Sequence, residues 1–220
     1  MKVIAKLTGL ISLYPGLLTF LFFGVAAAEV LSEKSAQDIV AIVENHYRLV
    51  NNITAKVVQN NFLRSIGKTQ KFEGRLWIKK PGKLRLDYTN GQTILIDGND
   101  ALFYSKKSEQ VIKKSFIDFQ HMNIPVAFLL GAANIRDDFD VSQLDSKTPR
   151  LMELLPKLSG AAMKKLRVMT DENGRITSLT IFDKAGNVTD IAFHDIQEGD
   201  KIDEQVFALK PPKGTEVIEQ

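Results

Sequence analysis

Residues 71–88 read KFEGRLWIKKPGKLRLDY, and this stretch predicts two adjacent strands joined by a turn at Pro81-Gly82. Proline fixes φ for a turn and glycine allows the backbone that follows, so the dipeptide marks a hairpin. On both sides of it, apolar residues alternate with residues that are charged except for Trp77. The apolar face carries Phe72, Leu76, Ile78, Leu84, Leu86 and Tyr88. A period of two over both runs indicates an antiparallel pair with one buried face.

Most of the remaining chain repeats this pattern. Short polar turns such as Asp97-Gly98 and Asn173-Gly174 separate the apolar runs, and no crossover helices intervene, which is typical of an antiparallel sheet. Pro211-Pro212-Lys213-Gly214 follows residues 206–209, and we expect it to end the fold. We expect about eleven strands, at residues 53–62, 72–79, 83–88, 92–97, 101–105, 110–115, 139–144, 151–155, 164–170, 175–182 and 188–196.

Two segments depart from the strand pattern. Residues 35–50 predict an amphipathic helix, with Ser35 as its cap and Asp38 completing a capping box. Residues 116–135 contain a shorter helix that begins near Pro125 and is apolar on nearly all sides. Such a helix is either buried all round or faces an apolar surface that opens at times.

The N-terminus has the features of a secretory signal peptide. Lys2 and Lys6 precede an apolar run, and Ala26-Ala27-Ala28 supplies a small-residue cleavage site before Glu29. We therefore expect residues 1–28 to be removed and residues 29–220 to form a single domain. The alternative is an uncleaved membrane anchor, because the apolar run approaches the length of a span.

Composition and motifs argue against several classes of function. The chain has 220 residues, a formal net charge of +3 and no cysteine, so nucleic-acid binding, disulfides and thiolate metal sites are not expected. His46, His121 and His194 lack metal-ligand spacing. No nucleophile, phosphate-loop or dinucleotide motif is present, so we expect no catalytic residues, no metal and no cofactor.

Four blocks in register make the chain resemble the LolA family, the periplasmic carriers of outer-membrane lipoproteins. The first is GRLWIKKPGKLR at residues 74–85, and the second combines IDG at 96–98, LFY at 102–104 and QV at 110–111. The third is NIPV at 123–126 with the apolar run to Leu130, and the fourth is FALKPPKGTEV at 207–217.

The resemblance implies an incomplete antiparallel β-barrel of about eleven strands, with a helical lid over an apolar cavity. It implies a periplasmic monomer that takes acylated lipoproteins from an inner-membrane ABC transporter and hands them to an acceptor at the outer membrane. No cofactor and no nucleic acid are implied. An acyl chain gains about 0.8 kcal/mol per buried CH₂, so a carrier must shield it from water.

The resemblance also assigns residues. Lys80 takes the position of a basic residue, arginine in well-known members, that ties the sheet to the lid through main-chain carbonyls; an exposed strand-end lysine is the alternative. Leu84 and Leu86 match positions at the cavity mouth and wall. Val126, Leu129 and Leu130 match lid positions that face the lipid. Cavity lining and ordinary core have the same composition, so both interpretations stay open for these five residues.

Three other functions remain open from the sequence. The carrier could also insert lipoproteins into the outer membrane itself, or it could carry another lipid, because fold similarity does not fix the ligand. A periplasmic hydrolase or sugar-binding module is the alternative from a different class; it would require convergent polar side chains in a cleft.

The N-terminal pattern yields the first prediction. Expressed in a bacterium with two membranes, the protein should appear in the periplasmic fraction with an intact mass that corresponds to a chain starting at Glu29. Mass spectrometry of the purified protein checks this. A full-length chain that stays with the inner-membrane fraction would show that the apolar run is an anchor.

Overall fold

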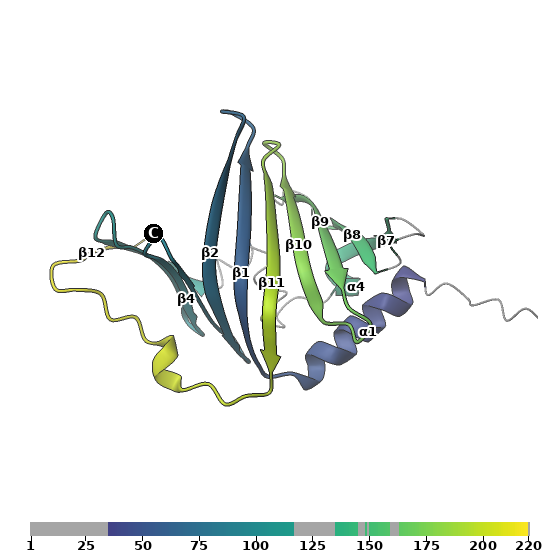
Figure 1. The fold of residues 1–220 in the computed structure, drawn as a ribbon, viewed down its shortest axis with the longest axis horizontal. Coiled ribbons are helices and arrows are strands. Elements are labelled where there is room, and N and C mark those ends of the chain that lie inside the picture. The colour runs from purple at the N-terminus through teal and green to yellow at the C-terminus, as the bar shows by residue number, and fades with distance from the viewer. Residues whose placement is uncertain (1–34, 117–134, 145–147, 149, 159–162, 220) are drawn as a thin grey trace, which may run out of the picture. The chain divides into compact units, whose positions relative to one another are not determined.

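A computed structural model describes residues 35–116, 135–144, 148, 150–158 and 163–219 of the chain. Its main element is a single sheet of twelve strands (Figure 1). Within these ranges, one helix precedes the first strand, and two short helices lie between later strands. The elements are α1 (Ala36–Leu49), β1 (Asn52–Leu63), β2 (Lys68–Lys79), β3 (Lys83–Tyr88), β4 (Gln92–Asp97), β5 (Asp100–Ser105), β6 (Gln110–Ser115), α4 (Ile135–Asp138), β7 (Phe139–Gln143), β8 (Leu151–Pro156), β9 (Met163–Thr170), β10 (Ile176–Asp183), β11 (Val188–Glu198), the 3₁₀ helix η1 (Glu204–Phe207) and β12 (Glu216–Glu219).

The strand order shows that the sheet is open. It runs β12-β6-β5-β4-β3-β2-β1-β11-β10-β9-β8-β7, so β12 and β7 form the two edges. Sequential hairpins build both halves, and the long strand β1 joins them by pairing with β2 on one side and β11 on the other. Every pairing is antiparallel except that of β12 with β6. The mainly β, incomplete-barrel fold expected from the sequence is confirmed.

The hairpin that opened the sequence analysis turns at the predicted dipeptide and carries the expected apolar residues on one face. Leu76 lies opposite Leu86, and Ile78 lies opposite Leu84. The Lys80–Pro81 peptide is cis, and Gly82 has a φ of 74°. Leu76, Ile78 and Leu84 are buried, so the alternation of apolar and charged residues does mark one core-facing side.

Helix α1 covers the core-facing side of the sheet. Ser35 and Asp38 form the predicted capping box, with the Ser35 Oγ accepting from the Asp38 N–H at 3.3 Å. Ile39, Val40 and Val43 are buried in the same cluster as the inward residues of β1, β2, β8, β9 and β10. The apolar stripe read from the sequence is therefore the face that packs on the sheet.

One glycine lets the β9–β10 turn touch the helix. Gly174 has a φ of 86°, and a Cβ at this position would lie 2.8 Å from the carbonyl oxygen of Ile42 in α1. Other residues rarely adopt this φ, and no side-chain carbon fits so close to a backbone oxygen. The turn and the helix backbone are thus in direct contact.

The C-terminal region differs from the expectation. The fold does not end at the Pro211-Pro212 turn, because β12 follows it and pairs in parallel with β6. Residues 206–209 begin inside the 3₁₀ helix η1 and pack against the outer face of the sheet. There, Leu95, Ile202 and Phe207 form a second buried cluster with the half-buried Trp77. The β2–β3 hairpin is therefore covered on both faces in this half, which its alternating pattern did not indicate.

Among the described residues, no helix has the length and apolar character needed to cross a membrane. The predicted signal peptide, residues 1–28, and most of the predicted helical insert lie outside the described residues.

The contact at Gly174 yields the second prediction. Gly174→Ala should lower the free energy of unfolding by about 2–4 kcal/mol, because it combines an unfavourable φ with overlap on the Ile42 carbonyl. Gly199→Ala is the matched control, since Gly199 has a φ of 84° with no atom within 4 Å of an added Cβ. The control should cost about 1 kcal/mol. Urea unfolding measures both, and equal losses would show that the helix contact is unimportant.

Candidate functional site: an apolar face closed by helix α1

The inner face of the sheet carries an apolar pocket beneath the end of α1. The pocket has a cavity volume of about 10 Å³, which is room for about one water molecule. That is far below the roughly 300–1,000 Å³ usual for ligand pockets. Its lining is apolar apart from one tyrosine: Tyr47, Ile53, Ala55, Leu76, Ile78, Ile176, Phe193 and Ile196.

A bulge in β11 shapes one wall of the pocket. The register between β1 and β11 shifts between Thr54 and Lys56, and Asp195 adopts a φ of 49°. The extra residue lets both Phe193 and Ile196 line the pocket, although three positions separate them. Asp195 itself is exposed and pairs with Lys56 at 2.8 Å.

Leu84 and Leu86 extend the same face one strand further. Leu84 is 2% exposed and pairs across to Ile78 and Ile96, whereas Leu86 is half-buried between Leu76 and Ile94. Both belong to the cluster that surrounds the pocket without lining the pocket itself. Their role in binding lipid remains a prediction.

Tyr47 joins the last turn of α1 to the sheet in two ways. Its hydroxyl oxygen accepts a hydrogen bond from the Ile176 N–H at the start of β10, at 3.1 Å. Its carbonyl is one of the last four of the helix, which have no partner within the helix. The Nζ of Lys80 donates to this carbonyl. The residue that closes the pocket is thus also the one that fastens the helix.

Lys80 is held in place by its own backbone. Its N–H donates to the Asn51 carbonyl at 2.8 Å, which sets the β2–β3 turn beside the chain leaving α1. Its ammonium lies 5.2 Å from the centre of the Tyr47 ring, within range of a cation–π contact. The lysine predicted to tie the sheet to a lid therefore contacts a main-chain carbonyl, and the helix that it contacts is α1.

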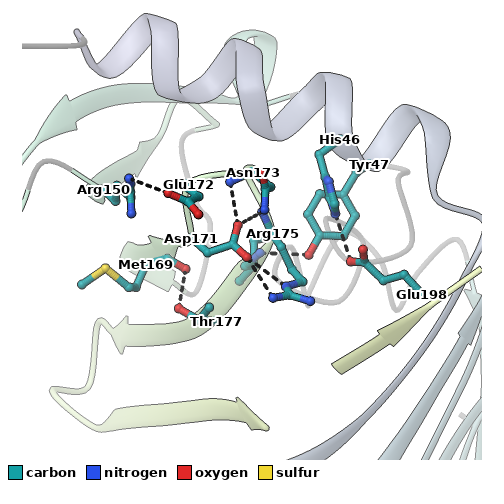
Figure 2. A network of polar contacts seen from close by, with 11 residues as sticks. His46, Tyr47, Arg150, Met169, Asp171, Glu172, Asn173, Arg175, Thr177 and Glu198 are labelled. Atoms are coloured by element: carbon teal, nitrogen blue, oxygen red, sulfur yellow. Dashed lines mark hydrogen bonds and ion pairs between the residues drawn. The ribbon is translucent and has the colours of Figure 1, made fainter. Parts of the chain in front are cut away.

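A second polar contact lies one residue earlier in the helix. His46 Nε2 and Glu198 Oε1, at the end of β11, are 2.9 Å apart and both side chains are largely buried. On the other side of Tyr47, the Asp171 carboxylate organises the β9–β10 turn by accepting from the Asn173 and Arg175 N–H groups at 3.0 and 2.9 Å. Figure 2 shows these contacts beneath the end of α1.

Burial shifts the pKa values of both groups that meet at Tyr47. Burial raises the pKa of the Tyr47 hydroxyl well above its usual range, although the hydrogen bond from Ile176 acts in the opposite direction. Burial also lowers the pKa of Lys80, while the nearby Glu198 raises it. Both shifts follow from placing polar groups at the edge of an apolar pocket.

The sequence did not single out Tyr47 or the His46–Glu198 pair. Tyr47 falls within the amphipathic helix predicted at residues 35–50. A tyrosine in the last turn of a core-facing stripe needs a partner for its hydroxyl, and that requirement was the available signal. The predicted lid residues Val126, Leu129 and Leu130 lie outside the described residues.

The described part of the chain offers no metal site. Within it, no group of three or more histidine or acidic side chains has the arrangement needed to hold a metal ion. The pocket contains one polar side chain, that of Tyr47, whose hydroxyl already accepts from Ile176. The geometry therefore suits an apolar ligand.

A sequence model described as "Outer membrane lipoprotein carrier protein LolA" matches residues 48–210, most of the chain. The protein belongs to the LolA family. The matched region includes the apolar face, Lys80, Leu84 and Leu86, and it begins near the end of α1.

Individual LolA-family relatives are distant in sequence. An outer-membrane lipoprotein carrier protein from Chromohalobacter salexigens is 29% identical over 69% of this chain and 72% of its own. One from Azotobacter vinelandii is 24% identical over 93% of this chain and 97% of its own. Among solved structures, a LolA superfamily protein from Nitrosomonas europaea matches 80% of this chain and 98% of that chain, at 14% identity and a TM-score of 0.46.

The buried hydroxyl of Tyr47 yields the third prediction. At pH 7, Tyr47→Phe should lower the free energy of unfolding by about 1–3 kcal/mol, because the buried Ile176 N–H loses its acceptor. Above pH 10 the unfolded tyrosine ionises and the folded one does not, so wild-type stability falls as pH rises. Between pH 9 and pH 11 the wild type should lose about 1.4 kcal/mol more than the variant.

Other groups with shifted pKa values titrate in this range without obscuring the comparison, among them Tyr88 and Lys80. Burial raises the pKa of Tyr88 to about 12, which lowers stability at high pH, whereas the lowered pKa of Lys80 gives the opposite sign. Both are present in wild type and variant, so they cancel in the difference. Urea unfolding at each pH measures the difference in free energy of unfolding between wild type and variant. Parallel curves of this free energy against pH would contradict the buried position of the Tyr47 hydroxyl.

Proposed function

We propose that this protein carries the acyl chains of lipoproteins from the inner to the outer membrane and catalyses no reaction. One observation carries the proposal: helix α1 closes an apolar face of the sheet, and polar contacts hold the end of that helix in place. Family membership supports the cargo class, since LolA relatives are named outer-membrane lipoprotein carriers.

The energetics favour a face of this kind. Burying an acyl chain of about sixteen carbons is favourable by roughly 0.8 kcal/mol per CH₂. Because the membrane already buries the chain, the cargo leaves it only for a site that is equally apolar. In the closed arrangement the pocket is small, and an acyl chain needs more room than it offers. Loading therefore requires α1 to move away from the sheet, which turns core residues into cavity wall.

The contacts at the end of α1 suit repeated opening. The bonds that Tyr47 makes with Lys80 and Ile176, and the His46–Glu198 contact, are polar, so water can replace each of them when the helix lifts. Lysine holds a carbonyl with fewer oriented donors than arginine does. We expect Lys80 to act as a latch that stabilises the closed state without making it permanent.

The proposal includes a location and partners. The exported chain, cleaved after Ala28, works as a monomeric single domain in the periplasm. It receives triacylated lipoproteins from an inner-membrane ABC transporter and passes them to an acceptor at the outer membrane. Val126, Leu129 and Leu130 would contribute to the lid, and Leu84 and Leu86 to the surface that the acyl chains touch.

The latch yields the fourth prediction. Lys80→Ala should shift the equilibrium toward the open, loaded form by about tenfold, because the closed state loses a hydrogen bond from a charged donor. Spheroplasts that retain outer-membrane lipoproteins are incubated with the purified protein, and the soluble one-to-one complex and its transfer to outer-membrane vesicles are measured. The variant should still form the complex. It should transfer its cargo more slowly than the wild type does.

Lys79→Ala is the matched control for this assay. Lys79 is adjacent in sequence, but its side chain pairs with Glu204 on the opposite face of the sheet. It should transfer cargo as the wild type does. Equal behaviour of the two variants would remove the latch from the proposal.

A charge on the apolar face tests the cargo surface. Leu84→Glu would place a carboxylate in the core, since Leu84 is 2% exposed, and loss of folding would obscure the result. Leu86→Glu, at a half-buried position, is the better variant, and it should form little complex while unfolding cooperatively. Binding of free phospholipid without release of lipoprotein would favour a carrier of another lipid. Failure to bind any lipid would overturn the proposed function.

A further inference from the structure

Two long hairpins extend past their neighbours at one end of the sheet. Strand β3 pairs with β2 only from Gly74 to Lys79, so residues 68–73 and the turn beyond them extend past β3 by about 20 Å. The β10–β11 hairpin lies beside this extension (Figure 1). The Arg64 N–H donates to Asn187 Oδ1 at 3.0 Å and joins the two turns.

Apolar side chains lie on the outer face of these two hairpins. Phe62, Val188 and Phe182 are register partners across β1, β11 and β10. Because Val57 faces the core and side chains alternate along β1, Phe62 points to the opposite face. Phe62 is 38% exposed, and Ile66, in the turn between β1 and β2, is 58% exposed. Packing in the core does not explain why these apolar side chains lie on the outer face.

Cations surround the apolar side chains. Arg64, Lys68 and Lys184 are exposed at the tips, and none of the three forms an ion pair with a carboxylate of the described chain. Lys165 and Arg167 lie 4.9 and 5.0 Å from the centre of the Phe182 ring.

Of the acidic groups nearby, Glu153 and Glu73 pair with cations, whereas Asp183 and the exposed Asp190 accept hydrogen bonds from neutral donors. Glu153 accepts from both Lys165 and Arg167, at 2.8 and 3.0 Å. The carboxylate of Asp183 accepts from the Asn187 N–H and amide, and Glu73 pairs with Lys71 at 2.7 Å. The three tip cations Arg64, Lys68 and Lys184 outnumber the carboxylates of Asp183 and Asp190, so the tips carry a net positive charge beside exposed apolar side chains.

We propose that these tips contact the surface of a phospholipid bilayer that contains anionic lipids. We call the surface the tip patch: Phe62, Ile66, Phe182 and Val188 with Arg64, Lys68 and Lys184. The isoleucine and the rings enter the boundary between headgroups and acyl chains, while the cations meet lipid phosphates. Peripheral membrane contacts combine these two features, and a contact with an acidic protein would not require an isoleucine at the extreme tip.

This contact goes beyond the proposed carrier function and does not rest on it. Lys80 lies beside the first residues of β1, and the tip patch lies at the other end of that strand. The patch is also on the outer face, away from the apolar pocket. The protein could therefore touch a membrane while α1 opens or closes.

Vesicle binding tests the tip patch. The exported, processed protein is sedimented with vesicles of phosphatidylcholine alone or with an equal share of phosphatidylglycerol, at low and high salt. Binding should require the anionic lipid and weaken with salt. Replacing both Lys68 and Lys184 by glutamine should weaken binding by about thirtyfold, because each lysine near an anionic surface contributes about a fivefold factor. Lys107→Gln with Lys213→Gln, two exposed turn lysines elsewhere, is the control with the same change of charge.

A label reports the apolar contact separately. The chain has no cysteine, so Ile66→Cys can carry a single environment-sensitive fluorophore. Val217→Cys is the matched control, since Val217 is β-branched and 57% exposed. Anionic vesicles should shift the emission at position 66 to shorter wavelength and leave position 217 unchanged.

The proposal is overturned by any of three results. Failure of the wild type to bind anionic vesicles would favour an acidic protein as the partner of this surface. Equal weakening of binding by the two pairs of lysine substitutions would indicate attraction by net charge alone. A label at position 66 that does not respond although the protein binds would place the membrane contact elsewhere. Each result leaves the lipoprotein-release assay unaffected.

Discussion

Tyr47 is the point at which the helix and the sheet depend on each other. Its ring closes the apolar pocket, its hydroxyl accepts from the first backbone N–H of β10, and its carbonyl accepts from Lys80. Separating α1 from the sheet breaks both bonds and exposes the apolar face in one movement. A buried polar group without a partner costs about 1–3 kcal/mol, so partial separation is unfavourable and the closed arrangement is well defined.

The two faces of the sheet are closed in different ways. Near β2–β5 the outer face is covered by the segment around η1, where Phe207 and Ile202 pack beside Trp77, and Arg85 donates to the Val206 carbonyl at 2.9 Å. The inner face is covered by α1, which is fastened near its end by polar contacts. Both covers combine apolar packing with hydrogen bonds, but the inner one lies over the apolar pocket that Tyr47 lines. For this reason we place the cavity of the proposed carrier on the α1 side.

Strand β1 connects the parts of the molecule that the proposals assign to different tasks. One end begins beside α1 and Lys80, and the other ends at the projecting hairpins with Phe62. Its inward residues Ile53, Ala55 and Val57 belong to the core, whereas outward residues such as Lys56 and Phe62 are exposed. Because side chains alternate strictly on a strand, one segment supplies an apolar inner wall and a separate outer surface.

The sequence by itself determined the antiparallel sheet, the core-facing side of the β2–β3 hairpin and the capping box of α1, because period-two alternation, turn residues and cap residues act over a few positions. Its resemblance to the LolA family also pointed to Lys80, the residue before Pro81. Only the tertiary structure revealed that Tyr47 fastens α1 to the sheet. It also revealed that the segment around η1 covers Trp77 and that β12 pairs in parallel with β6. These depend on residues far apart in the chain, such as Tyr47 and Ile176, and no local pattern records which distant backbone group a side chain will meet. For the same reason the sequence could not separate core from cavity wall at Leu84 and Leu86, since both environments select the same apolar residues.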